Sequence, residues 1–191
     1  MNKTQLKKDF NTSGYQIGAS KPKMIAWYFT NLFIFKSGLI PISTILVAIL
    51  RIFGAKIGKD VRIKPFVAIK YPWKLKLDDH CWLADCSIEN LEEVSIGKNV
   101  CISQKAMLLT GNHDYNRSTF DLMTGPIVLE DGVWIGARAI VCPGITVKSH
   151  AVLSVASVAT KDLESYSIYQ GNPAVKVNQR KIEDTATLLV F

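Results

Sequence analysis

Residues 129–164 read LEDGVWIGARAIVCPGITVKSHAVLSVASVATKDLE and contain a repeat with a period of six. An aliphatic residue or alanine stands at every sixth position, and a second set of mostly small residues follows each of them four places later. The first set is Leu129, Ile135, Val141, Val147, Leu153 and Ala159, and the second is Val133, Ala139, Ile145, Ala151, Ser157 and Leu163. Six uninterrupted repeats in one phase are not expected from chance alternation in an ordinary β-rich domain.

The same period extends upstream in three shorter blocks. Their sixth-position residues are Ile57, Ile63 and Ile69, then Leu77 and Leu83, then Ile96, Ile102 and Leu108. A glycine or another small residue often follows the aliphatic one, as in Ile57-Gly58 and Ile135-Gly136. The phase slips a little before Leu77 and Ile96, and much more before Leu129.

A period of six fits neither a helix, near 3.6, nor a plain strand, at 2. It fits a short strand followed by a corner, with one aliphatic side chain per hexad pointing inward. Three such sides close a triangular coil of about 18 residues, and coils stack by parallel pairing at about 4.8 Å. The sequence therefore predicts an all-β solenoid.

Composition excludes several other classes of protein. The chain has 191 residues, of which 48% are apolar and 20% charged, so it can bury a core large enough to offset the entropy of ordering. The four cysteines (Cys81, Cys86, Cys101 and Cys142) form no CxxC pair, which argues against a secreted disulfide scaffold and favours small buried thiols in a reducing compartment. The net charge of +7 favours anionic partners, but no nucleic-acid-binding motif accompanies it, and no nucleic-acid partner is expected.

The N-terminal residues 1–53 combine a basic arm with an apolar helical segment. Five lysines and one acid precede Met24, and the apolar stretch 24–50 that follows carries a single charge, Lys36. Lys36, Gly38 and Pro41 interrupt this stretch, so a membrane-spanning helix of about 20 residues is not expected. Two interpretations stay open: helices packed on the solenoid, or helices that also lie in a membrane interface, helped by Trp27 and Tyr28.

The large phase slip predicts a protruding loop. Leu108 and Leu129 are 21 residues apart, whereas 18 would keep the phase, and the intervening stretch is polar. We expect the external loop at about residues 114–126, beginning beside His113. His80 and His150 fall at the fourth place of their hexads, where we expect corner residues with no catalytic role.

Several segments resemble the hexapeptide-repeat acyltransferases. They are Thr110-Gly111-Asn112-His113-Asp114-Tyr115, Val133-Trp134-Ile135-Gly136-Ala137, Ala159-Thr160-Lys161-Asp162 and Gly171-Asn172-Pro173-Ala174. A narrower likeness, to the colanic acid biosynthesis acetyltransferases, rests on residues 51–58 (RIFGAKIG), 70–75 (KYPWKL) and 101–104 (CISQ).

The resemblance implies a left-handed parallel β-helix over residues 54–173, followed by a C-terminal tail at 174–191. It also implies an acetyl-CoA-dependent O-acetyltransferase that modifies a sugar hydroxyl in exopolysaccharide biosynthesis. The family works as a homotrimer without a metal. A cytoplasmic location is expected, at the inner face of the cytoplasmic membrane if the N-terminal segment makes a peripheral membrane contact there.

In the sugar acetyltransferases of this family, a histidine in a context like that of His113 is the base. An imidazole with its ordinary pKa of about 6.5 is largely neutral near pH 7 and can accept the proton of an attacking hydroxyl. Asp114 is expected to contact the acceptor or to orient the imidazole, although a backbone carbonyl could orient it instead. This mechanism needs no covalent enzyme intermediate, and no cysteine is assigned as a nucleophile.

The resemblance also assigns binding residues. The residues assigned to acetyl-CoA are Trp134, Ala137, Val155, Thr160 and Lys161. The family often has a basic residue that contacts the nucleotide phosphate, but here Val175 and Asn178 occupy the aligned positions. Lys176 and Arg180 are assigned to this contact in its place. The saccharide acceptor is assigned Asp85 and Asn90, together with Asp114.

Three other functions stay open. The enzyme could acetylate an amino sugar or a small xenobiotic, or the solenoid could be a non-catalytic scaffold. A carbonic-anhydrase-like zinc site would need His80, His113 and His150 to meet, and their wide spacing does not favour it.

Overall fold

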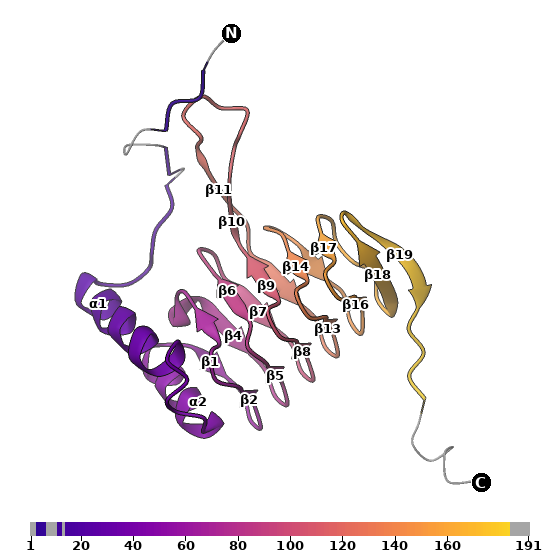
Figure 1. Cartoon of the computed structure of the whole chain (residues 1–191), viewed down its shortest axis with the longest axis horizontal. Helices are drawn as coiled ribbons and strands as arrows, with labels where there is room; N and C mark the ends of the chain where they lie inside the picture. Colours follow the sequence, from indigo (N-terminus) through magenta and orange to yellow (C-terminus); the bar gives the residue numbers. More distant parts are fainter. Residues whose placement is uncertain (1–2, 7–10, 13, 184–191) are drawn as a thin grey trace.

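The computed structural model describes residues 3–6, 11–12 and 14–183, most of them in a triangular β-solenoid. Successive coils stack along one axis from the N-terminal helices to the C-terminal strand (Figure 1). Three parallel sheets, here called A, B and C, form the sides, and the chain visits them in the order A, B, C in each coil. The predicted parallel β-helix is confirmed.

The strands of the sheets are short and pair in sequence order. Sheet A contains β1 (Lys56–Ile57), β4 (Leu75–Leu77), β7 (Val94–Ile96), β12 (Ile127–Leu129) and β15 (Thr146–Val147). Sheet B contains β2 (Arg62–Ile63), β5 (Trp82–Leu83), β8 (Cys101–Ile102), β13 (Trp134–Ile135), β16 (Val152–Leu153), β18 (Ser167–Gly171) and β19 (Ala174–Gln179). Sheet C contains β3 (Ala68–Ile69), β6 (Ser87–Glu89), β9 (Met107–Leu109), β14 (Ile140–Val141) and β17 (Val158–Ala159).

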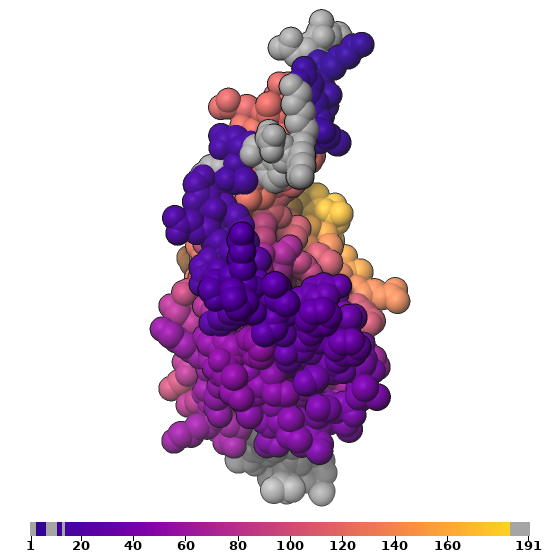
Figure 2. Space-filling view, turned by 90° about the vertical axis from the view of Figure 1, so that its left-hand side faces the viewer, coloured from indigo at the N-terminus to yellow at the C-terminus, as the bar shows by residue number. Residues whose placement is uncertain are grey.

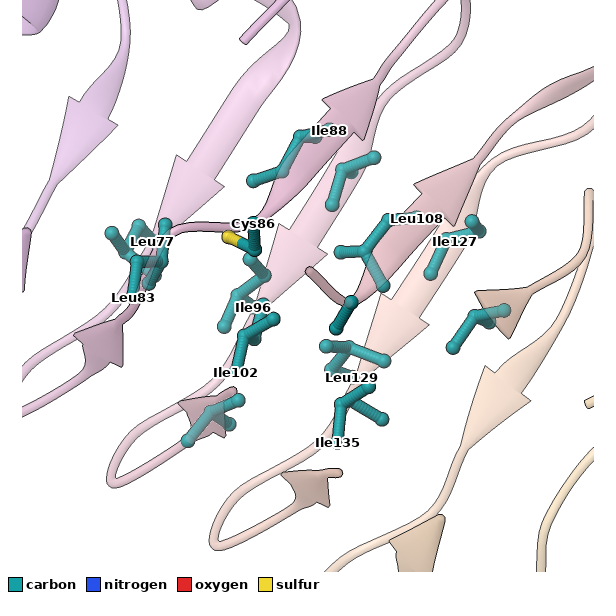
Figure 3. Packing of buried hydrophobic residues seen from close by; sticks show 14 of the residues in the cluster. Leu77, Leu83, Cys86, Ile88, Ile96, Ile102, Leu108, Ile127, Leu129 and Ile135 are labelled. Atoms are coloured by element: carbon teal, nitrogen blue, oxygen red, sulfur yellow. The ribbon is translucent and has the colours of Figure 1, made fainter. Parts of the chain in front are cut away.

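The sixth-position residues form three buried columns inside the prism. In sheet B the column is Ile63, Leu83, Ile102, Ile135, Leu153 and Tyr169. Figure 3 shows the side chains of neighbouring coils stacked in the interior. Ile88, which the hexad count omitted, pairs with Ile69 and Leu108 in sheet C. The corner before it is one residue shorter than the others, so a strict period of six passes over it.

The fourth residue of a hexad lies at a corner of the coil. Residues with positive φ at these places include Asp60, His80, Asn99, Lys105, Gly132, Arg138, Gly144, His150 and Ala156. The left-handed conformation turns the chain sharply at each corner, and most L-residues tolerate it at some cost. His80 and His150 are therefore corner residues, as the sequence predicted.

Two helical segments cover the N-terminal end of the solenoid. Helix α1 (Lys21–Thr30) continues into the π-helical turn η1 (Asn31–Phe35), and α2 (Ser43–Ile52) follows. Trp27, Phe35 and Leu50 are buried against the first coil. Figure 2 shows that these helices form one end face of the molecule. Within the part of the chain that the structure describes, no helix has the length and apolarity to cross a membrane.

A hairpin protrudes where the phase slips. It consists of β10 (Gly111–His113) and β11 (Leu122–Thr124), which pair in antiparallel fashion, and it confirms the predicted external loop (Figure 1). The N-terminal arm runs along it, since Gln5 N–H donates to the Ser118 carbonyl and Leu122 N–H donates to the Asn11 carbonyl. Lys7, Lys8 and Asp9 of the basic arm, and residues 184–191 of the tail, lie outside the described residues.

Short insertions and a terminal strand complete the chain. The two residues added before Leu77 form part of η2 (Pro72–Lys74), a 3₁₀ turn at the end of sheet C. At the other end, β19, which the sequence analysis assigned to the tail, turns back and pairs antiparallel with β18.

Candidate active site

His113 ends strand β10 and lies opposite Leu122, at the outer end of the paired part of the hairpin. Its Nδ1 lies 2.8 Å from the backbone oxygen of Phe120. The ring of Phe120 stacks on the imidazole, with centroids 4.7 Å apart and planes inclined by 14°. The hairpin therefore fixes both the position of the histidine and the plane of its ring.

The Phe120 carbonyl also selects the tautomer of the neutral ring. A carbonyl oxygen only accepts, so Nδ1 must carry the proton and donate, and the lone pair then resides on Nε2. This is the arrangement that a general base requires. The sequence left two groups open as the one that orients the imidazole, Asp114 or a backbone carbonyl. In the structure the carbonyl of Phe120 contacts the ring.

Asp114 instead stabilises the turn that follows β10. Its Oδ1 accepts a hydrogen bond from Asn116 N–H at 3.0 Å, and its Oδ2 lies 3.8 Å from Nε of Arg117. A contact between Asp114 and the acceptor stays a prediction.

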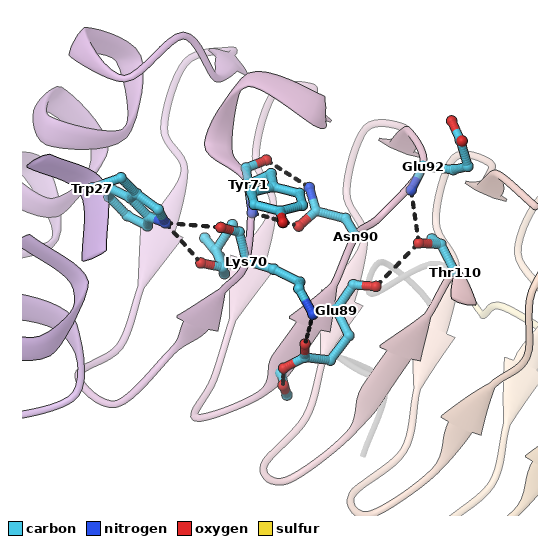
Figure 4. A network of polar contacts seen from close by, with 9 residues as sticks. Trp27, Lys70, Tyr71, Glu89, Asn90, Glu92 and Thr110 are labelled. Atoms are coloured by element: carbon cyan, nitrogen blue, oxygen red, sulfur yellow. Dashed lines mark hydrogen bonds and ion pairs between the residues drawn. The ribbon is translucent and has the colours of Figure 1, made fainter. Parts of the chain in front are cut away.

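The root of the hairpin is anchored to the preceding coil through Thr110. Thr110 is buried, and its Oγ1 donates to the Glu89 carbonyl at 3.0 Å and accepts from Glu92 N–H at 2.9 Å. Figure 4 shows this contact next to the pair formed by Lys70 and Glu89. At the next residue, Gly111, a Cβ would lie 2.4 Å from Cδ1 of Leu91, so this side chain would have to move to admit one. Thr110 thus has a local physical reason in its two hydrogen bonds.

Asp85 and Asn90, which were assigned to the acceptor together with Asp114, lie apart from each other. Asn90 is fully buried, and its amide exchanges hydrogen bonds of 2.9 and 2.7 Å with the backbone of Tyr71 (Figure 4). It holds a corner in place, and its amide does not face solvent. Asp85 precedes β6 and is paired with Lys105. The hairpin follows β9, so Asp85 and the hairpin lie at opposite ends of the strands of sheet C.

The residues assigned to acetyl-CoA divide among the edges of the prism. Trp134 is half-exposed on sheet B, and its Nε1 donates to Oγ of Ser103 at 2.9 Å. Ala137 and Val155 lie on the edge between sheets B and C, where Val155 is exposed. Thr160 and Lys161 lie on the edge between sheets C and A, the edge from which the hairpin leaves.

The two substitutes for the phosphate-binding residue lie near the third edge, between sheets A and B. The Nζ of Lys176 is 2.7 Å from Oε2 of Glu164, and this hydrogen bond raises the pKa of the lysine. Nη1 of Arg180 donates to the carbonyls of Gly132 and His150 at 2.8 and 3.2 Å. The structure brings neither side chain to the edge that carries Ala137 and Val155.

His80, His150 and the buried cysteines, which could in principle act as nucleophiles or metal ligands, are held in contacts within the solenoid. His80 lies 3.4 Å from Asp60, and His150 stacks on Tyr166. Among residues 3–6, 11–12 and 14–183, no three His, Cys, Asp or Glu side chains are grouped as a metal site. Burial raises the pKa of Cys81 to about 11 and that of Cys86 to about 12, which keeps both thiols neutral.

Phe120 is a candidate site residue that the sequence did not predict. Its carbonyl and its ring orient His113, yet it stands seven residues away in a polar loop, and no sequence pattern marks it. Its positive φ of 55° is the structural sign that the chain turns back toward β10 at this point.

The comparison with known proteins decides the family. The chain is 41% identical over 133 residues to a protein of Escherichia coli K12 named as a colanic acid biosynthesis acetyltransferase, WcaF, covering 69% of this chain and 73% of that protein. The chain belongs to the hexapeptide-repeat acetyltransferase family. A shorter match, 44% identical over 69 residues, links it to a chloramphenicol acetyltransferase of Agrobacterium fabrum, covering 36% of this chain and 33% of that one. No family model matches the chain.

Solved structures share the fold. A hexapeptide-repeat acetyltransferase of Vibrio cholerae in complex with acetyl coenzyme A matches with a TM-score of 0.76 and 19% identity, over 91% of this chain and 94% of that one. A maltose O-acetyltransferase of Clostridium difficile matches with a TM-score of 0.76 and 23% identity, over 85% and 88%. The fold is the left-handed parallel β-helix that the resemblance implied.

Proposed function

We propose that this member of the family transfers an acetyl group from acetyl-CoA to a sugar hydroxyl, with His113 as the general base. The observation that supports this role is the hydrogen bond between Nδ1 and the Phe120 carbonyl, which places the basic lone pair on Nε2. The acetyl-CoA complex of the Vibrio cholerae neighbour and the name of the Escherichia coli relative support the two substrates.

The reaction needs no covalent enzyme intermediate. Nε2 accepts the proton of the acceptor hydroxyl while the hydroxyl oxygen attacks the thioester carbonyl carbon. The tetrahedral intermediate collapses with cleavage of the carbon–sulfur bond, and the departing thiolate takes the proton from Nε2. Backbone N–H groups along the edges of the coils are the natural donors to the oxyanion.

Two copies of the chain would complete the site. The hairpin with His113 leaves the edge between sheets C and A, whereas Ala137 and Val155 lie on the edge between sheets B and C. These groups can border one groove if the edge between sheets C and A of one copy faces the edge between sheets B and C of its neighbour. A homotrimer repeats this contact three times around a closed ring.

The acceptor is proposed to be a saccharide of exopolysaccharide biosynthesis, presented at the cytoplasmic face of a membrane. The end face formed by α1, η1 and α2 supports the membrane contact. Its exposed apolar side chains are Ile25, Tyr28, Phe29, Leu32, Phe33, Leu39, Ile42, Ile45 and Ile52. No acidic residue stands between Asp9 and Asp60, while Lys21, Lys23, Lys36 and Arg51 do, so the face is complementary to anionic lipid.

A flotation experiment with vesicles tests the membrane contact. Replacing Phe29 and Phe33 by serine should shift the protein from the floating to the soluble fraction with anionic vesicles, and Val177→Ser with Ile182→Ser, exposed at the other end, serves as the control. These changes leave Leu46 and Leu50 in place, whereas deletion of residues 1–53 would uncover the core. Equal recovery of wild type and the Phe29/Phe33 variant in the soluble fraction would contradict the contact.

An acceptor panel tests the function itself. The purified protein is incubated with labelled acetyl-CoA and with free sugars, nucleotide sugars, lipid-linked oligosaccharides, amino sugars and chloramphenicol. We expect label in an alkali-labile ester on a saccharide. Transfer to an amino group alone would favour the amino-sugar alternative. Transfer to chloramphenicol alone would favour the xenobiotic alternative, which the name of the Agrobacterium relative suggests, and absence of any transfer would favour a non-catalytic scaffold.

A further inference from the structure

Two hollows lie outside the hairpin. A shallow one of about 680 Å³ runs along the outer face of sheet A, and its charged lining residues are Lys56, Lys76, Asp78, Glu130 and Asp131. A second one of about 310 Å³, here called the α1 pocket, lies between α1 with η1 and the ends of β3 and β6. Tyr28, Asn31, Tyr71 and Glu89 are among its lining residues, and they combine aromatic surface with a few polar groups, as ligand sites commonly do.

The aromatic wall of the α1 pocket is held rigidly. The ring of Tyr71 stacks on Trp73 with centroids 5.1 Å apart, and Nε1 of Trp73 donates to the Ile17 carbonyl at 2.8 Å. The backbone of Tyr71 is fixed by both amide atoms of Asn90 (Figure 4). On the helix side, Tyr28 is largely exposed and forms the opposite wall.

The polar groups of the pocket include an unsatisfied acceptor. Oδ1 of Asn31 is buried and has no hydrogen-bond partner within the described structure. Asn31 opens the π-helical turn, in which Lys36 N–H donates to the Asn31 carbonyl at 2.8 Å. A buried acceptor without a partner is costly, and π-helical turns are frequent at functional sites. Beside it, Lys70 and Glu89 form a half-exposed pair at 3.6 Å.

The α1 pocket is connected to the root of the hairpin that carries His113. Glu89 lines the pocket, and its carbonyl accepts the hydrogen bond from Thr110, three residues before the histidine. Strand β3 lies two rungs from β9, or about 10 Å at the usual strand spacing. The N-terminal arm joins the two places, because Asn11 contacts Leu122 on the hairpin and Ile17 contacts Trp73 at the pocket.

We propose that the α1 pocket binds a sugar unit of the acceptor other than the unit that is acetylated, so that the enzyme selects an oligosaccharide. A sugar ring offers C–H faces to Tyr28 and Tyr71, and its hydroxyls can donate to the Glu89 carboxylate. The buried Oδ1 of Asn31 becomes a further acceptor once the side chain turns toward the pocket. The distance from the pocket to the hairpin exceeds what one ring spans. This inference rests on the proposed acetyl transfer to saccharides.

The test compares acceptors of different length in wild type and in two variants. The probes are glucose, maltose and maltotetraose, followed by the matching α- and β-linked galactose series. Asn31→Ala removes the orphaned acceptor, and Tyr71→Ala removes the ring while the Asn90 bonds, which go to the backbone, remain. Tyr166→Asn, on a distant corner that favours asparagine, is the control. The readouts are kcat/KM for each acceptor and calorimetric titration of each saccharide.

We expect a tetrasaccharide to exceed its monosaccharide in kcat/KM, and both pocket variants to reduce the tetrasaccharide value by about five- to tenfold. Acetylation of the monosaccharide and hydrolysis of acetyl-CoA should not change. Equal losses on both acceptor lengths, or no loss, would overturn the pocket assignment while the acetyl transfer stands. If wild type acetylates no saccharide, the proposed function fails, and the titration decides: saturable binding of a tetrasaccharide that Asn31→Ala weakens supports the pocket, and absence of binding overturns it.

Discussion

Ile102 points into the prism from β8 and is fully buried between Leu83 and Ile135 of the adjacent coils. Replacing it by alanine leaves a cavity that the rigid stack cannot close. We expect Ile102→Ala to lower the free energy of unfolding by about 2–5 kcal/mol. The exposed Ile182→Ala should change it by less than about 0.5 kcal/mol. Urea unfolding measures both, and equal effects would argue against the inward columns.

Cysteine reactivity tests whether the thiols are structural. Burial favours the neutral form, which raises the pKa of Cys86 to about 12 and that of Cys81 to about 11. The thiolate fraction at pH 8 is therefore small and rises only as the pH approaches these values. We expect iodoacetamide to label both residues only after unfolding in guanidinium chloride, with sites assigned by peptide mass spectrometry. Rapid labelling of Cys86 in the native protein would contradict this placement.

At the scale of single residues, the sequence predicts most of the interior and part of the site. The sixth-position columns follow from counting, because inward positions must be apolar. Ile88 escapes the count, since the shortened corner breaks the period without changing the composition. His113 was identified through the resemblance, whereas Phe120 could not be, because its contact depends on how the hairpin closes.

The elements of the solenoid depend on the close approach of successive coils. A Cβ at Gly136 would lie 2.7–2.8 Å from the backbone of Leu153, Ser154 and Val155. Gly58 and Gly97 approach the next coil in the same way, which explains why glycine follows several inward aliphatic residues. These contacts exist only between coils, so the sequence showed the glycines but not the reason for them.

Substitution at Gly136 tests this explanation. Gly136→Ala should destabilise the protein by about 1–3 kcal/mol, because backbone must shift to admit the methyl group. Gly144 has positive φ, and a Cβ at this position would meet no atom within 4 Å, so Gly144→Asn should cost far less. Thermal unfolding of both variants provides the comparison, and equal melting temperatures would contradict the role of close approach.

At the scale of the whole molecule, the residues assigned to the proposed site lie on separate edges of the prism, and this predicts a site shared between copies. Ala137→Trp fills the edge assigned to acetyl-CoA, and His113→Ala removes the base, so each variant alone should be inactive. Each mixed trimer should regain about one of its three sites, because each site takes one residue from each of two copies and only one pair of neighbours then combines the two intact residues. Co-expression with two affinity tags isolates the mixed species, and sedimentation gives its mass. Inactive mixed oligomers, or an active monomer, would contradict a shared site.

At this scale the sequence predicted the architecture better than the site. The repeat determines the stacking of coils, since every hexad carries the same requirement for an inward side chain. The arrangement of Ala137, Thr160 and Arg180 on different edges depends on three-dimensional stacking, and a site between them depends on neighbouring copies, which a single sequence does not specify.

The most direct measurement of the central claim is the rate of CoA release by His113→Ala with the best saccharide acceptor. Loss of the base should reduce kcat by about 10²–10⁴-fold, because general base catalysis typically contributes that factor. Circular dichroism should match wild type, since the hairpin projects from the core, and His150→Asn at a solenoid corner should retain full activity. A His113→Ala enzyme that keeps kcat within about tenfold of wild type would contradict the account.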